Sequence, residues 1–194
     1  MSRPLEEIDL TALGPMTMAE ALAVLRGGDL EAHRARQLEY DEIAKEAEQY
    51  RLLAPAQWPS LEFNWDFRAE AQRFALDGCQ PDSFAESYPL GLRLGWVSVE
   101  AFDSKLSLQN RRALGELWKV GEKDKLAMAI AYLRRGKPIT PPLVLPLPAQ
   151  KQICLEGGNH RYTVAKFSGQ IELPIYVDPS KADALGAIVT VRWP

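Results

Sequence analysis

Cysteine and histidine are scarce in this sequence of 194 residues, which contains only Cys79, Cys154, His33 and His160. Two cysteines cannot build a disulfide framework, and they cannot supply the four thiolates of the common all-cysteine zinc site. The low cysteine content is typical of a protein from a reducing compartment. We therefore expect a cytoplasmic protein without a disulfide scaffold.

Long apolar runs are also missing. No stretch approaches the about 18 consecutive apolar residues that a membrane helix needs. The sequence opens with charged residues, among them Arg3, Glu6 and Asp9, and these do not precede an apolar stretch. A secretory signal would have a basic start followed by an apolar segment. We expect neither a membrane span nor a secretory signal.

The net charge of −3 hides an unequal distribution along the chain. Residues 1–88 contain 8 Lys and Arg against 17 Asp and Glu, a balance of −9. Residues 89–194 contain 15 against 9, a balance of +6. A basic second half favours an anionic ligand for this part of the chain. Ordinary solvated surfaces would give the same counts.

The first 54 residues are predicted to form an acidic helical extension. Thr17 and Glu20 have the spacing of a capping box, which predicts a short helix that ends at Gly27 and Gly28. A longer, mostly polar helix should follow over residues 29–53, with one thin apolar stripe. Such a stripe packs on the chain's own core or binds a partner helix, and the sequence leaves both open.

Residues 55–88 are predicted to form an ordered connection that packs on the core. They combine several prolines with Trp58, Phe63, Trp65, Phe67 and Phe74. Aromatic side chains can stack on nucleic-acid bases, but no basic residue stands between Phe63 and Phe67. Core packing is the favoured interpretation.

Residues 89–194 are predicted to form an α/β or α+β domain with a mixed sheet and flanking helices. The apolar patterns and stop signals predict strands at 94–99, 143–145, 152–156, 171–177 and 188–193, and helices at 124–135 and 160–167. Prolines 142, 146 and 148 flank or interrupt the second of these strands, which suggests a position at the edge of the sheet.

A strand-to-helix turn at residues 156–161, with the sequence Glu-Gly-Gly-Asn-His-Arg, carries the clearest chemical signal. Asn159 is a favoured N-cap residue, which would place His160 and Arg161 in the first helical turn. Cations are unfavourable there unless an anion lies beside them, because the helix dipole is positive at that end. The turn therefore suggests a phosphate site. The alternative is a purely structural turn with Arg161 pointing into solvent.

At these residues the chain resembles the ParB/sulfiredoxin superfamily. The resemblance rests on the segment Gly-Lys-Pro-Ile-Thr-Pro-Pro-Leu-Val-Leu at 136–145, the turn at 156–162, Gly169, and the strand Leu-Pro-Ile-Tyr-Val at 173–177. It covers about residues 89–180 and leaves the acidic extension unexplained. It implies a ParB/sulfiredoxin-like fold that binds ATP or another nucleoside triphosphate, with Mg²⁺.

Two departures from the superfamily pattern narrow the expectation. Sulfiredoxin-type reductases carry a nucleophilic cysteine where this chain has Asn159, so reduction of sulfinic acids is not expected. Chromosome-partitioning relatives continue into a helix-turn-helix domain, whereas only a short stretch follows Val177 here. A reader of partition sites is likewise not expected.

The chain is similar in length and architecture to plasmid-encoded fertility-inhibition members of this superfamily. That similarity implies an ATPase with DNA-cleaving activity, which acts in the bacterial cytoplasm and blocks DNA transfer through a conjugative type IV secretion system. The partners would be DNA and a conjugation coupling protein or a relaxase–DNA complex. Two alternatives remain: a non-enzymatic adaptor that docks on a secretion or relaxase component, and a small-molecule kinase of the same fold.

The proposed chemistry assigns a role to each residue of the turn. Gly157, Gly158, Asn159 and Arg161 would bind the nucleotide, with Arg161 also stabilising charge in the transition state. His160 would orient or protonate a leaving oxygen. Glu156 would hold magnesium or activate water, or it is a surface charge.

A basic cluster at Arg134, Arg135 and Lys137, together with Lys166, is the candidate DNA-binding surface. Contact with the DNA backbone needs no base-specific motif, and it weakens steeply with salt. The three clustered residues also end a predicted helix, where cations complement the dipole. Helix capping is the alternative explanation.

Overall fold

A computed structural model describes residues 15–25, 27–76 and 78–194, and it divides the chain into two compact units, residues 1–46 and 47–194. The described elements are the α-helices α1 (Met18–Leu25), α2 (Leu30–Ala47), α3 (Pro81–Ser87), α4 (Val99–Lys105), α5 (Lys123–Arg134), α6 (Asn159–Phe167) and α7 (Ala182–Gly186), the strands β1 (Arg93–Ser98), β2 (Leu143–Leu147), β3 (Gln152–Gly157) and β4 (Glu172–Val177), and the 3-10 helices η3 (Glu48–Tyr50), η4 (Pro55–Gln57), η5 (Ala69–Leu76), η6 (Leu114–Glu116), η7 (Pro148–Gln150) and η8 (Pro179–Lys181). The fold class is mixed α/β, as predicted.

The described part of the first unit is helical. The predicted capping box forms at the start of α1, where the amide of Glu20 donates to Oγ1 of Thr17 and the Glu20 carboxylate accepts from the Thr17 amide. Arg34 of α2 donates to the same carboxylate over 2.7 Å. The hydrogen bond from Arg34, followed by those that the backbone and the side chain of Thr17 make to the carboxylate, lowers the pKa of Glu20 to about 2. The local spacing therefore predicted both the cap and the helix that it starts.

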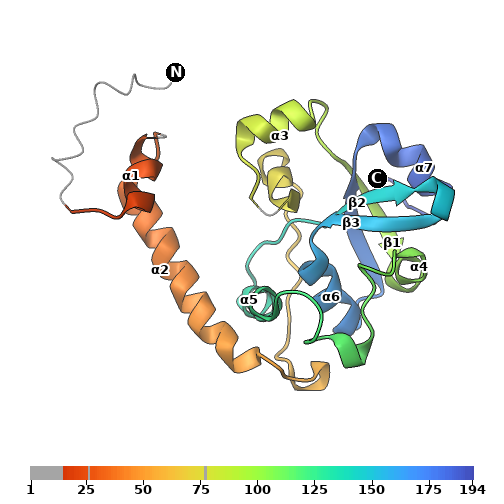
Figure 1. Cartoon of the computed structure of the whole chain (residues 1–194), viewed down its shortest axis with the longest axis horizontal. Coiled ribbons are helices and arrows are strands. Elements are labelled where there is room, and N and C mark those ends of the chain that lie inside the picture. The colour runs from red at the N-terminus through yellow and green to blue at the C-terminus, as the bar shows by residue number, and fades with distance from the viewer. Residues whose placement is uncertain (1–14, 26, 77) are drawn as a thin grey trace. The chain divides into compact units, whose positions relative to one another are not determined.

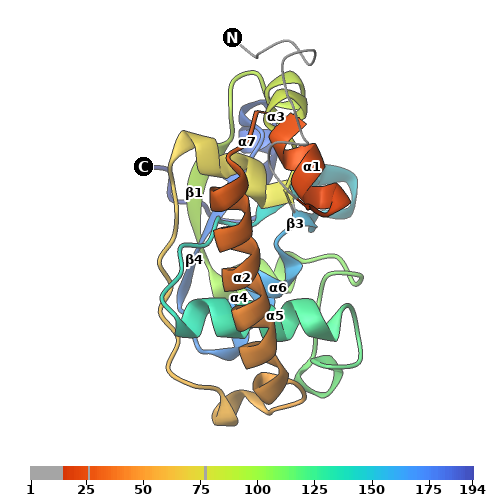
Figure 2. The same cartoon turned by 90° about the vertical axis from the view of Figure 1, so that its left-hand side faces the viewer.

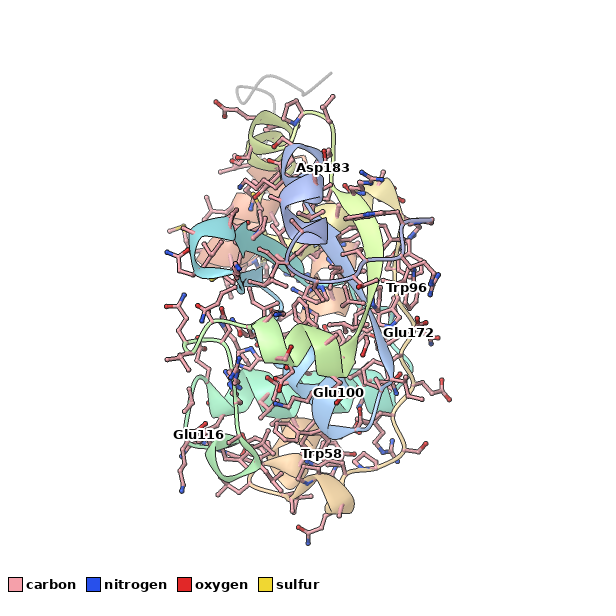
Figure 3. All side chains as sticks on the ribbon, turned by 90° about the vertical axis from the view of Figure 1, so that its right-hand side faces the viewer. Trp58, Trp96, Glu100, Glu116, Glu172 and Asp183 are labelled. Atoms are coloured by element: carbon pink, nitrogen blue, oxygen red, sulfur yellow. The ribbon has the colours of Figure 1, made fainter. Side chains whose placement is uncertain are left out.

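The second unit contains a four-stranded mixed sheet in the order β1-β4-β2-β3. Strands β1, β2 and β3 are labelled in Figure 1. The pairs β1/β4 and β2/β3 are antiparallel, and the central pair β4/β2 is parallel. Figure 2 shows β1 and β4 side by side. In Figure 3, Trp96 of β1 and Glu172 of β4 lie on this pair, near the end where Arg192 bonds to Glu172 over 3.0 Å.

The two faces of the sheet bury different sets of side chains, because neighbouring residues of a strand point to opposite faces. On one face, Leu173, Ile175 and Val177 of β4 join side chains from α4, α6 and α7 in the main core. On the other face, Tyr176 joins Leu143 and side chains from η5 and α3 in a smaller cluster. The segment before the sheet therefore covers the face opposite α6.

The aromatic connection lies within the second unit. Phe63 and Trp65 pack against the main core. Trp65 also forms a parallel bridge with Ile139, whose amide donates to the Asn64 carbonyl over 2.9 Å. Phe67 and Phe74 remain 42% and 47% exposed. Backbone pairing as well as apolar burial therefore fixes this segment.

The prediction that the proline-containing strand lies at an edge is wrong, because β2 lies between β4 and β3. A proline lacks the N–H that an interior strand must donate. The parallel pairing with β4 involves only Leu143 and Val144, so it ends before Pro146. Pro142, just before the strand, takes part through its carbonyl, which accepts from the Tyr176 amide over 2.8 Å.

The predicted last strand, residues 188–193, is also wrong. Arg192 alone pairs with β1, through two hydrogen bonds of 2.9 Å with Trp96. Val191 and Trp193 instead pack over Gly95, where a Cβ atom would lie within 2.8 Å of both side chains. The alternating apolar residues cover a glycine and do not extend the sheet.

Candidate functional site: the turn between β3 and α6

The turn that the sequence singled out connects the end of β3 to the start of α6. Gly157 ends the strand, and Gly158 is the N-cap with a left-handed φ of 85°, so the expectation that Asn159 caps the helix is wrong by one residue. Asn159, His160 and Arg161 form the first helical turn, which contains no acidic residue. His160 and Arg161 therefore lie at the positive end of the helix dipole, as predicted.

The chain itself occupies the space that the two glycines leave. A Cβ atom on Gly157 would lie 1.9 Å from the carbonyl oxygen of Ala75, which belongs to η5. A Cβ atom on Gly158 would lie 2.7 Å from Cβ of Pro142. Both glycines are buried. They permit close packing of η5 and the residue before β2 on the turn, a role that the sequence did not reveal.

Arg161 holds this packing together. Its guanidinium donates to the carbonyl oxygen of Thr140 over 2.6 Å and to that of Ala75 over 3.1 Å. The two acceptors precede β2 and end η5, so one side chain connects α6 to two separate segments. Thr140 adds a further bond, from its hydroxyl to the Ala71 carbonyl over 3.2 Å. Arg161 does not point freely into solvent, and its fork is used for internal carbonyls.

A second polar network supports the turn from the loop after α4. The buried Asn110 side chain accepts from the Leu155 amide of β3 over 3.0 Å and from the Ser107 hydroxyl over 2.9 Å. It donates to the Asn159 side chain over 3.1 Å. Asn110 therefore ties the loop to the strand and to the first turn of α6. Its sequence context, a polar loop without periodicity, gave no signal for this role.

Glu156 and His160 differ in their exposure. Glu156 is the last side chain before the glycines and is exposed, whereas His160 is half-buried. Among the described residues, no group of three or more His, Cys, Asp or Glu side chains is placed to hold a metal ion. One exposed carboxylate does not form the octahedral oxygen site that Mg²⁺ prefers. Among the described side chains, the turn offers a magnesium ion the carboxylate of Glu156 alone.

Lys166, a predicted DNA contact, lies at the end of α6. Its ammonium donates to the Asp103 carboxylate over 2.8 Å and to the Arg112 carbonyl over 2.9 Å. The Tyr162 hydroxyl donates to the same Asp103 carboxylate, and burial followed by this hydrogen bond raises the pKa of Tyr162. The lysine therefore fastens α6 to α4 and to the following loop.

The other predicted DNA contacts cluster where α5 ends. Arg134 is the last residue of the helix and Arg135 is its C-cap, and both are exposed. Lys137 is half-buried in the following turn, where its amide donates to the Tyr132 carbonyl over 3.0 Å. Cations at this end complement the helix dipole. Their placement serves helix capping and is also compatible with a DNA backbone contact.

Within the part of the chain that the structure describes, no helix is long and apolar enough to cross a membrane. Comparisons with models of protein families, with curated proteins and with solved structures found no match to this chain.

Proposed function

We propose that this protein binds a nucleoside triphosphate at the turn between β3 and α6 and hydrolyses it. The observation that supports this function is the placement of His160 and Arg161 in the first turn of a helix that begins with a glycine pair and has no acidic residue there. A helix amino terminus with added cations favours phosphate over any neutral ligand.

The internal hydrogen bonds of Arg161 change which residues we expect to bind the phosphates. Its guanidinium already donates to two carbonyl oxygens, so it acts as a positioning residue that fixes the turn. Phosphate oxygens would be bound by backbone N–H groups at the start of α6 and by His160. Glu156 would accept a proton from the attacking water as the bond between the β and γ phosphates breaks. Any magnesium ion would arrive on the phosphates of the nucleotide.

The experiment is direct binding and phosphate release with the purified full chain and ATP, CTP or ADP. His160→Ala should weaken binding by at least tenfold, while Lys119→Ala should leave it within about twofold. Lys119 is an exposed cation on a different loop, so its replacement controls for effects of a surface substitution away from the turn. The function is refuted when none of the nucleotides binds, or when both variants behave alike.

In the wider biological role that we propose, nucleotide hydrolysis accompanies DNA cleavage and blocks plasmid transfer through a type IV secretion system. The resemblance to fertility-inhibition proteins and the basic end of α5 support this role. Arg134→Ala and Arg135→Ala should then weaken binding to duplex DNA and reduce the salt dependence of that binding. DNA affinity that does not depend on salt would contradict the proposal.

A non-enzymatic adaptor is the second candidate, and one feature of α2 favours it. Leu38 and Tyr40 are 65% and 50% exposed on α2, whereas its apolar residues Leu30 and Ile43 are buried. A partner that covers such a side chain removes its apolar surface from water, which favours docking. If α2 docks on a transfer component, Leu38→Ser should abolish inhibition of conjugation in cells, whereas His160→Ala should not. The opposite pattern would exclude the adaptor.

A further inference from the structure

Arg112 is a buried arginine whose guanidinium has no partner among the residues that the structure describes. It lies in the loop between α4 and α5, which Glu116 marks in Figure 3, and only 6% of its surface is exposed. Among residues 15–25, 27–76 and 78–194, no side chain or backbone oxygen accepts a hydrogen bond from its guanidinium, and no carboxylate pairs with it. Its backbone carbonyl, by contrast, accepts from Lys166.

The neighbouring arginine shows that partners are within reach of this loop. Arg111 is exposed, yet its guanidinium donates to the carbonyl oxygens of Ser104 and Leu106 over 2.9 and 3.1 Å. The buried Arg112 lacks such bonds, and burial alone lowers its pKa. A buried charge is costly unless it is paired, so proteins rarely keep one without a purpose.

The Arg112 guanidinium lies against the start of α5. A Cβ atom on Gly121 would lie 2.4 Å from one of its terminal nitrogens, so the guanidinium occupies the space that this glycine leaves open. Gly121 directly precedes Glu122, the N-cap of α5, and the Glu122 side chain makes no capping bond. The amino terminus of a helix is positive. A buried cation and a positive helix end thus meet without an anion between them.

The acidic side chains of this helix end are engaged elsewhere. Glu122 pairs with Lys125 over 3.0 Å, and Asp124 pairs with Arg51 over 3.3 Å. Neither carboxylate pairs with Arg112, although both belong to the same turn of chain. The protein therefore leaves the charge of Arg112 available to a ligand.

We propose that Arg112 and the first turn of α5 form a binding site for the phosphate group of a small ligand. A phosphate can accept the two parallel N–H bonds of a guanidinium and the backbone N–H groups of a helix start together. Gly121 is required because a side chain there would displace the guanidinium. The site shares no ligand-binding residue with the turn between β3 and α6, and it stands without the proposed hydrolysis.

The test is a titration of the full chain with inorganic phosphate and with AMP, at constant ionic strength, followed by calorimetry and by the melting temperature. Arg112→Met should weaken phosphate binding by at least tenfold and should not lower the melting temperature without phosphate, since it removes an unpaired buried charge. Arg111→Met, the matched control, should leave phosphate affinity within about twofold. His160→Ala should also leave it unchanged, which separates this site from the nucleotide turn.

The two ligands identify the source of the phosphate. Tighter binding of AMP assigns the site to a phosphate ester, and tighter binding of inorganic phosphate assigns it to the free ion. The proposal is overturned when neither ligand binds at millimolar concentration, when Arg112→Met and Arg111→Met respond equally, or when only duplex DNA binds through Arg112. A large loss of stability in ligand-free Arg112→Met would also overturn it, because the arginine would then have a structural partner.

Discussion

Replacement of Arg161 by alanine should destabilise the second unit by about 2 to 4 kcal/mol. The side chain donates two hydrogen bonds from a charged group, to Thr140 and to Ala75, and both acceptor residues are buried. Hydrogen bonds to charged groups contribute about 1.5 to 3 kcal/mol each, and the two bonds of one side chain are not additive. Because the acceptors belong to different segments, the loss should also loosen η5.

Urea denaturation followed by tryptophan fluorescence measures this loss, because all five tryptophans lie in the second unit. Arg161→Lys is the informative companion, since one ammonium cannot reproduce the fork that spans both carbonyls, and we expect it to recover about half of the stability. Hydrogen exchange should show the largest loss of protection in residues 69–76. A change below about 0.5 kcal/mol in Arg161→Ala would refute the positioning role.

Three further predictions test the packing and the electrostatics. Gly157→Ala should lower the free energy of unfolding in urea by about 3 kcal/mol or more, because its Cβ would collide with the Ala75 carbonyl. Gly169 has a φ of 78° and open space around it, so Gly169→Ala should cost about 1 kcal/mol. Equal losses in the two variants would contradict the collision. Lys166→Met should lower the free energy of unfolding by about 1 to 2 kcal/mol and leave the salt dependence of DNA binding unchanged. A reduced salt dependence would show that Lys166 contacts DNA. The Glu20 carboxylate should titrate with a midpoint near pH 2 in an NMR experiment. Its contribution to stability is then complete above pH 4.5 and is lost as the pH falls through 2. A midpoint near 4.5 would contradict the capping network.

Local patterns in the sequence predicted most helices and strands, because their causes are local. The capping box at Thr17 starts α1, and the apolar spacing from Leu126 to Leu133 marks the buried face of α5. Gly169, with φ 78°, ends α6 as expected. In each case the deciding interactions lie within a few residues, so one short window of sequence contains them.

Patterns that depend on distant partners misled the sequence interpretation. The alternation of residues 188–193 has the period of a strand, yet Val191 and Trp193 cover Gly95, which is almost a hundred positions away in the chain. Pro146 suggested an edge strand, but β4 is too short on that side to require its missing N–H. Strand order depends on which segments meet, and periodicity does not report that.

The sequence by itself determined the class of the fold, the glycine turn and the position of His160 and Arg161 in the first turn of α6. These follow from residue types and short spacings, which act through backbone sterics and the helix dipole. The tertiary structure alone decided which groups the arginine side chains contact. Arg161 reaches carbonyls 21 and 86 positions away. Arg112 is buried beside Gly121, and its guanidinium has no partner in the described part of the chain. Burial and the choice of hydrogen-bond partners depend on contacts between distant segments. Arg161 therefore connects parts of the fold, whereas Arg112 is a candidate ligand-binding residue.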